Sequence, residues 1–278
     1  MSAPDEPSDR VVAAFGGEVT QMTRLPGGQG GSFRAGPVAL KPVTDEREVA
    51  WLATVLAHVD GGNEFRVGRP ITLPDGSCAL GGWSATSWLE GAHEPSRFDD
   101  VLAVSGAFHR ALAEVPATWP EFLRDRTTPW AVGDRVAWGE TAVATGSHTL
   151  RGLLDRLAPH LAGEPRGLSL QVIHGDIGGN VLFADASGLP PAVIDMSPYY
   201  RPRSFADAVL VADAVAWDGA PLTFAERFLA TAESGSALLA RALVFRVVAA
   251  VELWGAASAR VAAEVQAYHP LVALLDLP

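Results

Sequence analysis

The spacing of apolar residues changes near residue 90, and this change constrains the fold more than any other feature. Before it, short extended segments alternate with glycine and proline turns, around one amphipathic segment from Asp45 to about Val59. After it, apolar residues recur mostly at helical spacing. The sequence therefore predicts an α+β chain with a small sheet-rich region, residues 10–90, and a larger, mainly helical region, residues 91–278, with an embedded hairpin.

The expected elements follow from these patterns. Strands are expected at residues 38–41, 65–68, 71–73, 79–88, 170–174, 181–184 and 192–195. Helices are expected at residues 45–59, 98–115, 149–161, 204–217, 222–234, 236–256 and 258–266, and a tryptophan-rich, turn-rich stretch covers residues 119–138.

Charge and composition exclude several classes of protein. The 278 residues carry a formal net charge of -11, which disfavours nucleic-acid binding and is compatible with a cationic small molecule. The single cysteine, Cys78, rules out an intrachain disulfide. The apolar run Leu238–Val251 contains Arg241 and Arg246, so it indicates a buried helix and not a membrane span. The polar, acidic start of the chain lacks a signal peptide, and a cytoplasmic location is expected.

A glycine-rich turn follows Arg24. Gly27, Gly28, Gly30 and Gly31 lie within five positions and precede Ser32. A backbone without side chains can approach phosphate oxygens closely and donate N–H groups to them. An ordinary hairpin turn explains the same glycines and stays open.

Lys41 is the only lysine in the chain, and it ends the short strand Val38–Lys41. "VALK" is close to the V-A-I-K strand whose lysine pairs with ATP phosphates. Such a lysine needs an acidic partner, for which Glu48 on the following helix is the better candidate and Glu46 the second. The alternative is a surface lysine near helix-terminal acids.

A polar loop, His174–Asn180, lies between two apolar strands that fix its ends. Asp176 could accept or orient a substrate proton, and Asn180 could bind a divalent cation. An antiparallel hairpin would return Asp195 beside Asn180, and two hard oxygen ligands suit Mg²⁺. The alternatives are an Asx turn for the loop and a strand-terminal carboxylate for Asp195.

The order of these features matches that of a kinase: glycine turn, strand lysine, helix glutamate, loop aspartate and asparagine, and hairpin aspartate. The chain thus resembles the aminoglycoside phosphotransferase family, over residues 25–217. The resemblance rests on "HGDIGGNVLF", which begins His-Gly-Asp where protein kinases have His-Arg-Asp, and on "AVIDMS".

The resemblance implies a protein-kinase-like bilobal fold and an enzyme that uses ATP and Mg²⁺ to phosphorylate a hydroxyl of a small molecule. It implies Asp176 as catalytic base, Asn180 and Asp195 as Mg²⁺ ligands, and Lys41 as the ATP-phosphate lysine. It also implies a hinge, Trp88, Leu89, Glu90 and Gly91, whose backbone meets adenine.

The chain departs from the family pattern at the loop. Three residues, Ile177–Gly179, separate Asp176 from Asn180, where the family has four. Ser197–Pro202 also stands where the family often has a glycine–aspartate–proline segment. Gly178 and Gly179 could permit a tighter loop that still directs both side chains correctly. Alternatively, the loop is distorted, and the protein is a nucleotide-binding pseudoenzyme or regulator. A protein that binds no nucleotide is a third reading.

The acceptor, the choice of ATP or GTP and the oligomeric state are left open by the sequence. A cationic sugar or amine is the acceptor class that acids of the helical region would favour. The candidate acids are Asp207, Asp213, Asp218 and Glu226.

Overall fold

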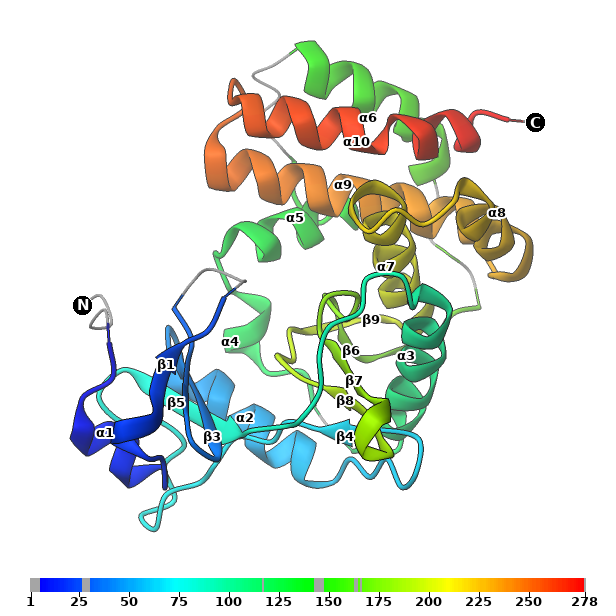
Figure 1. Cartoon of the computed structure of the whole chain (residues 1–278). Helices are drawn as coiled ribbons and strands as arrows, with labels where there is room; N and C mark the ends of the chain where they lie inside the picture. Colours follow the sequence, from blue (N-terminus) through cyan, green and yellow to red (C-terminus); the bar gives the residue numbers. More distant parts are fainter. Residues whose placement is uncertain are drawn as a thin grey trace. The chain divides into compact units, whose positions relative to one another are not determined.

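The computed structural model describes residues 6–26, 31–116, 118–142, 148–162, 165 and 167–277 (Figure 1). The chain divides into two compact units, each discontinuous along the sequence. The first contains residues 1–93, 110–118 and 180–196, and the second contains residues 94–109, 119–179 and 197–278. This partition differs from the predicted boundary near residue 90 because the hairpin at residues 180–196 belongs to the first unit.

A four-stranded antiparallel sheet forms the first part of the first unit, in the order β1-β2-β3-β5. Its strands are β1 (Met22–Arg24), β2 (Phe33–Ala35), β3 (Val38–Pro42) and β5 (Trp83–Ser87). Val38 and Leu40 of β3 are buried against a core that includes Phe33 and Trp83, whose rings meet edge to face at 5.7 Å. Because side chains alternate along a strand, Lys41 lies on the face opposite this core.

Helix α2 (Glu46–Ala57) follows the strand that carries Lys41. It begins where the sequence predicted, because the Asp45 carboxylate accepts a hydrogen bond from the backbone N–H of Arg47 at 2.9 Å. The helix ends at Ala57, two residues before the predicted end. Val55 and Leu56, in the last turn of the helix, are buried. Glu48 lies in the first turn.

A second, three-stranded sheet of the first unit has the order β4-β8-β7. Its strands are β4 (Arg66–Val67), β7 (Val181–Ala184) and β8 (Leu189–Val193). The link after β5 pairs with this sheet, because Ala92 and Phe183 exchange two backbone hydrogen bonds of 2.9 Å. Gly91 has φ +141°, and a Cβ there would lie 2.9 Å from the Phe183 carbonyl oxygen. Only glycine fits this close approach.

The second unit is mainly helical and is built around α9 (Gly235–Trp254), which is buried along most of its length. Figure 1 shows α9 between α5 (Pro129–Ala137) and α10 (Ala259–Leu275), and it also contacts α6 and α7. The other helices are α3 (Phe98–Ala113, to His109 in this unit), α4 (Glu121–Arg124), α6 (His148–Leu161), α7 (Arg203–Trp217) and α8 (Leu222–Thr231). Among the described residues, no helix is both long enough and apolar enough to cross a bilayer.

Strand β6 (Leu170–His174) has a partner that the sequence did not predict. It pairs antiparallel with β9 (Pro198–Pro202), from Leu170↔Pro202 to His174↔Pro198. Prolines at both ends of β9 suppress the usual strand pattern, since proline is depleted from strands. The pairing is decided by burial, because Pro198, Tyr199 and Pro202 are buried in the second unit.

Three further predictions about elements were wrong. The strand expected at residues 71–73 is irregular, although Ile71 N–H donates to the Ala85 carbonyl at 2.7 Å. The turn-rich stretch 119–138 contains α4 and α5, and the Thr128 hydroxyl caps α5 by accepting from Ala131 N–H. Helix α10 continues past Pro270 to Leu275, beyond the predicted end at residue 266, because buried side chains such as Leu271 and Val272 compensate for the missing proline N–H.

Candidate functional site

A cavity of about 170 Å³ lies in the first unit, between β3, β5, α2 and the end of β8. Three of its lining residues were singled out from the sequence: Lys41, Glu48 and Asp195. The full lining is Lys41, Pro42, Val43, Thr44, Asp45, Glu48, Val49, Leu52, Leu56, Gly68, Pro70, Ser84, Thr86, Asp195 and Met196. The cavity is thus lined by both charged side chains and apolar side chains of α2.

Lys41 forms an ion pair with Asp195, with 2.8 Å between Nζ and Oδ2. Both side chains are partly exposed, at 39% and 42%. The sequence favoured Glu48 as the acid beside this lysine. Glu48 lines the same cavity, and the carboxylate observed in an ion pair with Lys41 is that of Asp195. Asp195 reaches this position with φ +53°, a left-handed conformation that aspartate tolerates better than most residues.

Asn180 and Asp195 lie at the same end of the β7–β8 pair, as the predicted hairpin requires. Val181 pairs with Val193, and Ile194 N–H donates to the Asn180 carbonyl at 3.0 Å. Asn180 and Asp195 therefore lie just beyond Val181 and Val193, the last residue pair at this end of the two strands. Their side chains offer an amide oxygen and a carboxylate, both hard donors of the kind that Mg²⁺ prefers, so this donor set fits the ion.

The predicted hinge lies just after β5. Trp88 N–H donates to the Pro37 carbonyl at 2.8 Å, and the Arg34 guanidinium stacks 4.3 Å from the Trp88 ring centre. The Glu90 carbonyl accepts from Arg66 at 2.7 Å. Among the described residues, Trp88, Leu89 and Glu90 are outside the cavity lining, so their contact with a nucleotide stays a prediction.

The glycine-rich segment joins β1 and β2. Gly27, Gly28 and Gly30 are outside the described residues, whereas Gly31 and Ser32 are described. The Ser32 carbonyl accepts from Leu25 N–H at 2.9 Å, which closes the base of a hairpin. This confirms the predicted hairpin and leaves its role toward phosphate a prediction.

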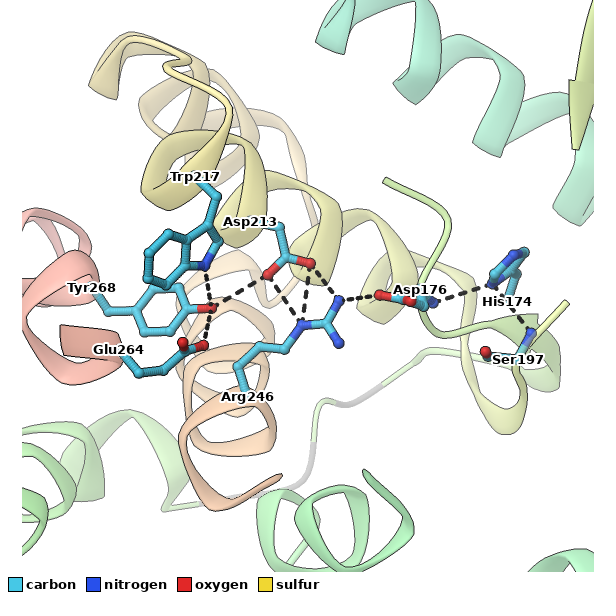
Figure 2. A network of polar contacts seen from close by, with 8 residues as sticks. All are labelled: His174, Asp176, Ser197, Asp213, Trp217, Arg246, Glu264 and Tyr268. Carbon is cyan, nitrogen blue, oxygen red and sulfur yellow. Dashed lines mark hydrogen bonds and ion pairs between the residues drawn. The ribbon is translucent and has the colours of Figure 1, made fainter. Parts of the chain in front are cut away.

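The loop that carries Asp176 belongs to the second unit and is fixed by its neighbours. His174 Nδ1 accepts hydrogen bonds from the backbone N–H groups of Asp176, at 3.2 Å, and Ser197, at 3.5 Å (Figure 2). His174 N–H in turn donates to His109 Nε2 at 3.0 Å, and both imidazoles are completely buried. His174 therefore supports the loop by hydrogen bonding.

The glycines of this loop differ in what they contribute. A Cβ on Gly175 would lie 2.4 Å from the Tyr199 ring, so Gly175 leaves space for a buried aromatic side chain. Gly178 and Gly179 have no left-handed φ, and Gly179 has open space around it. The short Asp176–Asn180 connection thus does not depend on glycine conformations, contrary to the explanation drawn from the sequence.

Arg246, a residue that sequence reasoning did not place in the site, contacts Asp176. Its Nη2 lies 2.5 Å from Asp176 Oδ1 and also binds Asp213, while its Nε lies 3.1 Å from both oxygens of Asp213. Burial opposes the charged form of Arg246, but the two carboxylates raise its pKa well above the usual value. A cation within the apolar run Leu238–Val251 was the signal available in the sequence.

The acids proposed for an acceptor are distributed differently from the prediction. Asp213 holds Arg246, and Asp207 is buried, where it accepts from the Ser105 hydroxyl at 2.8 Å and pairs with Arg203 at 3.2 Å. Burial raises the pKa of Asp207. Asp218 is half-buried at the end of α7, and Glu226 is exposed on α8. Asp207 and Asp213 are therefore engaged in internal polar contacts.

Comparison with known families identifies the chain. The model of the phosphotransferase enzyme family, APH, matches residues 38–198, which is more than half of the 278 residues and includes Lys41, Asp176 and Asp195. The chain belongs to this family, which confirms the resemblance drawn from the sequence. Among curated proteins, none matches the chain.

Solved structures establish the fold. An aminoglycoside phosphotransferase from Alicyclobacillus acidocaldarius is 17% identical, with a TM-score of 0.58 over 99% of this chain and 94% of that chain. The choline kinase LicA from Streptococcus pneumoniae is 11% identical, with a TM-score of 0.58 over 92% and 94% of the two chains. A choline/ethanolamine kinase family protein from Mesorhizobium loti is 16% identical, with a TM-score of 0.54 over 92% and 88%. The chain has the protein-kinase-like fold of these enzymes.

Proposed function

We propose that this protein is an ATP- and Mg²⁺-dependent phosphotransferase that acts on a hydroxyl of a small molecule. The observation that supports the proposal most is the cavity in which Lys41 and Asp195 approach to 2.8 Å. Lys41 is the one lysine of the chain, and Asp195 ends the hairpin that begins at Asn180. Lys41 and Asp195 line the cavity, and Asn180 lies at the same end of the β7–β8 pair as Asp195. A cation and oxygen donors of this kind are the groups that a metal–nucleotide complex requires.

Each group has a separate task in this proposal. Lys41 holds the ATP phosphates, and Glu48, which lines the same cavity, helps to orient the lysine. Asn180 and Asp195 would hold Mg²⁺, which when bound neutralises charge on the phosphates. Asp176 orients the acceptor hydroxyl and takes its proton as the acceptor oxygen bonds to the γ-phosphorus. The bond from that phosphorus to the β–γ bridging oxygen breaks, and ADP leaves with the electron pair.

We propose an acceptor of the kind that the structural relatives handle: an aminoglycoside, an amino sugar or a similar hydroxyl compound. Structures of related aminoglycoside phosphotransferases include a ternary complex with AMP-PNP and hygromycin B, and a complex with GDP and kanamycin. These name two acceptors and two nucleotide types worth testing. The net charge of -11 also favours a cationic acceptor.

A second candidate is a nucleotide-binding regulator with impaired phosphotransfer. The observation in its favour is the three-residue connection between Asp176 and Asn180, one residue shorter than in the family. This reading retains nucleotide binding in the Lys41 cavity and loses turnover.

A two-step experiment separates these functions. A thermal-shift screen of ATP and GTP with Mg²⁺ is expected to raise the melting temperature. ADP production is then measured with aminoglycosides, amino sugars and choline as acceptors, and Asp176→Ala serves as the inactive control. Binding without turnover on any acceptor would favour the regulator, and no nucleotide-dependent shift would contradict both candidates.

A further inference from the structure

Arg246 lies where it can control the geometry of Asp176. It projects from α9 with a side chain that is 11% exposed, whereas the Asp176 side chain is 48% exposed. Nη2 donates to Asp176 Oδ1 at 2.5 Å. The guanidinium thus binds one oxygen of the carboxylate from the protein side, and the carboxylate as a whole remains accessible to solvent.

Arg246 is itself held by Asp213, which contacts Nη2 as well as Nε. Its Nε lies 3.1 Å from both Asp213 oxygens, and the Tyr268 hydroxyl lies 3.3 Å from Asp213 Oδ1 (Figure 2). Trp217 Nε1 donates to the Tyr268 oxygen at 3.3 Å, and Glu264 Oε1 lies 3.2 Å from the same hydroxyl. The chain of contacts therefore runs from α10 and α7 through Arg246 to the loop.

This arrangement fixes Arg246 more firmly than a single ion pair would. A planar guanidinium bound along one edge by a carboxylate has little rotational freedom. Burying a cation without a partner costs folding free energy, and the carboxylate of Asp213 offsets this desolvation cost for Arg246. Asp213 can therefore set the direction from which Arg246 reaches Asp176.

We propose that Arg246 is a positioning residue for phosphotransfer: it holds Asp176 Oδ1 so that the carboxylate presents its other oxygen to the acceptor hydroxyl. Asp213 and Tyr268 anchor it. The inference rests on the proposed role of Asp176. It deepens that role by specifying which residue orients the base, and it assigns a use to a charged group on an otherwise apolar helix.

The test compares wild type with Arg246→Ala, Arg246→Lys and a matched control, Arg156→Ala. Arg156 also pairs with an aspartate in the second unit, Asp276, but on the exposed surface. The readout is phosphate release from Mg·ATP with water as acceptor, with and without about 50 mM guanidinium chloride, far below the molar concentrations that denature proteins. Sodium chloride at equal ionic strength is the salt control.

Arg246→Ala is expected to lower kcat at least tenfold while KM for ATP stays within twofold, because a misplaced base loses part of the acid–base contribution. Guanidinium is expected to restore part of this activity in Arg246→Ala alone. The kcat of Arg246→Lys is expected to lie between those of wild type and Arg246→Ala. An ammonium keeps the charge but cannot bind Asp176 and Asp213 with the planar geometry of a guanidinium. Wild-type kcat in both Arg246 variants, or a loss that guanidinium does not relieve in a folded variant, would overturn the proposal.

A double-mutant cycle keeps the inference separate from the proposed function. The unfolding midpoints in urea are measured for wild type, Asp176→Asn, Arg246→Lys and the double variant. Non-additive midpoint shifts are expected, because the two side chains share one contact. Additive shifts would overturn the inference whatever the activity, whereas non-additive shifts with an inactive wild type would overturn the proposed function and not the contact.

Discussion

The buried pair of histidines behind the Asp176 loop ties the stability of the second unit to pH. His109 is completely buried, its Nδ1 lies 2.8 Å from the Ser105 carbonyl, and its Nε2 accepts from His174 N–H. Both nitrogens are thus satisfied in the neutral ring with the proton on Nδ1. Burial lowers the pKa of His109 to about 3, despite the Ser105 hydrogen bond, and the His174 and Arg203 charges act in the same direction as burial.

The sign of the effect follows from proton uptake. The unfolded chain binds a proton at His109 near pH 6.5, whereas the folded protein does so only near pH 3. Between these values the unfolded state holds more protons, so stability is fully present above pH 6.5 and is lost as the pH falls. From pH 7.5 to pH 5 the loss is about 2 kcal/mol from this residue alone.

His109→Gln is the substitution that tests this reasoning, because an amide can still donate to the Ser105 carbonyl and accept from His174 N–H. Urea unfolding free energies are measured at pH 7.5 and pH 5 for wild type, His109→Gln and His58→Gln, an exposed-histidine control. Carboxylates and other shared groups cancel in the comparison. The pH-dependent loss is expected to be about 2 kcal/mol smaller in His109→Gln than in wild type. Parallel pH dependence of these two proteins would refute the buried-neutral account.

Three further outcomes follow from the sites. Lys41→Met is expected to weaken Mg·ATP binding at least about tenfold by calorimetry, because charge-assisted hydrogen bonds to phosphate are lost; unchanged affinity would remove Lys41 from the nucleotide site. Gly175→Ala is expected to cost about 1–3 kcal/mol of unfolding free energy because its Cβ meets the Tyr199 ring at 2.4 Å. Gly179→Ala, with open space around it, should unfold at nearly the wild-type urea concentration; equal effects at the two glycines would contradict the packing described. Chelation by EDTA or Asp195→Asn is expected to abolish most ATP-dependent transfer, as measured by ADP production, and full activity without divalent metal would argue against the Asn180–Asp195 site.

Local patterns predicted much of the first unit. The short strand that ends near Lys41 was predicted from the sequence, and Asp45 marked the start of α2. Fifteen residues with one turn between apolar strands were enough to place Asp195 at the Asn180 end of a hairpin. Each of these depends on residues near one another in the sequence, where spacing and propensity carry the information.

Contacts between residues far apart in the sequence could not be predicted from such local patterns. Strand β9 has prolines at both ends, and only its burial against β6 reveals it. Glu48 was favoured beside Lys41 because it is close in sequence, whereas the observed partner, Asp195, is brought in by a different strand. Arg246 was visible as a charge in an apolar helix, but its contacts with Asp176 and Asp213 depend on how α7, α9 and the loop pack. Sequence patterns do not specify such packing.

We propose that Asp176 acts as the base in phosphotransfer from ATP. Transfer of labelled γ-phosphate to the acceptor that gives the highest turnover, with Mg²⁺, tests it most directly in wild type and Asp176→Asn. Asparagine keeps the size of the side chain but cannot take a proton, so kcat is expected to fall by about 10²–10⁴-fold. ATP affinity should stay close to that of wild type. Equal kcat in the two proteins, or a wild type that transfers no label to any acceptor while binding Mg·ATP, would contradict the account.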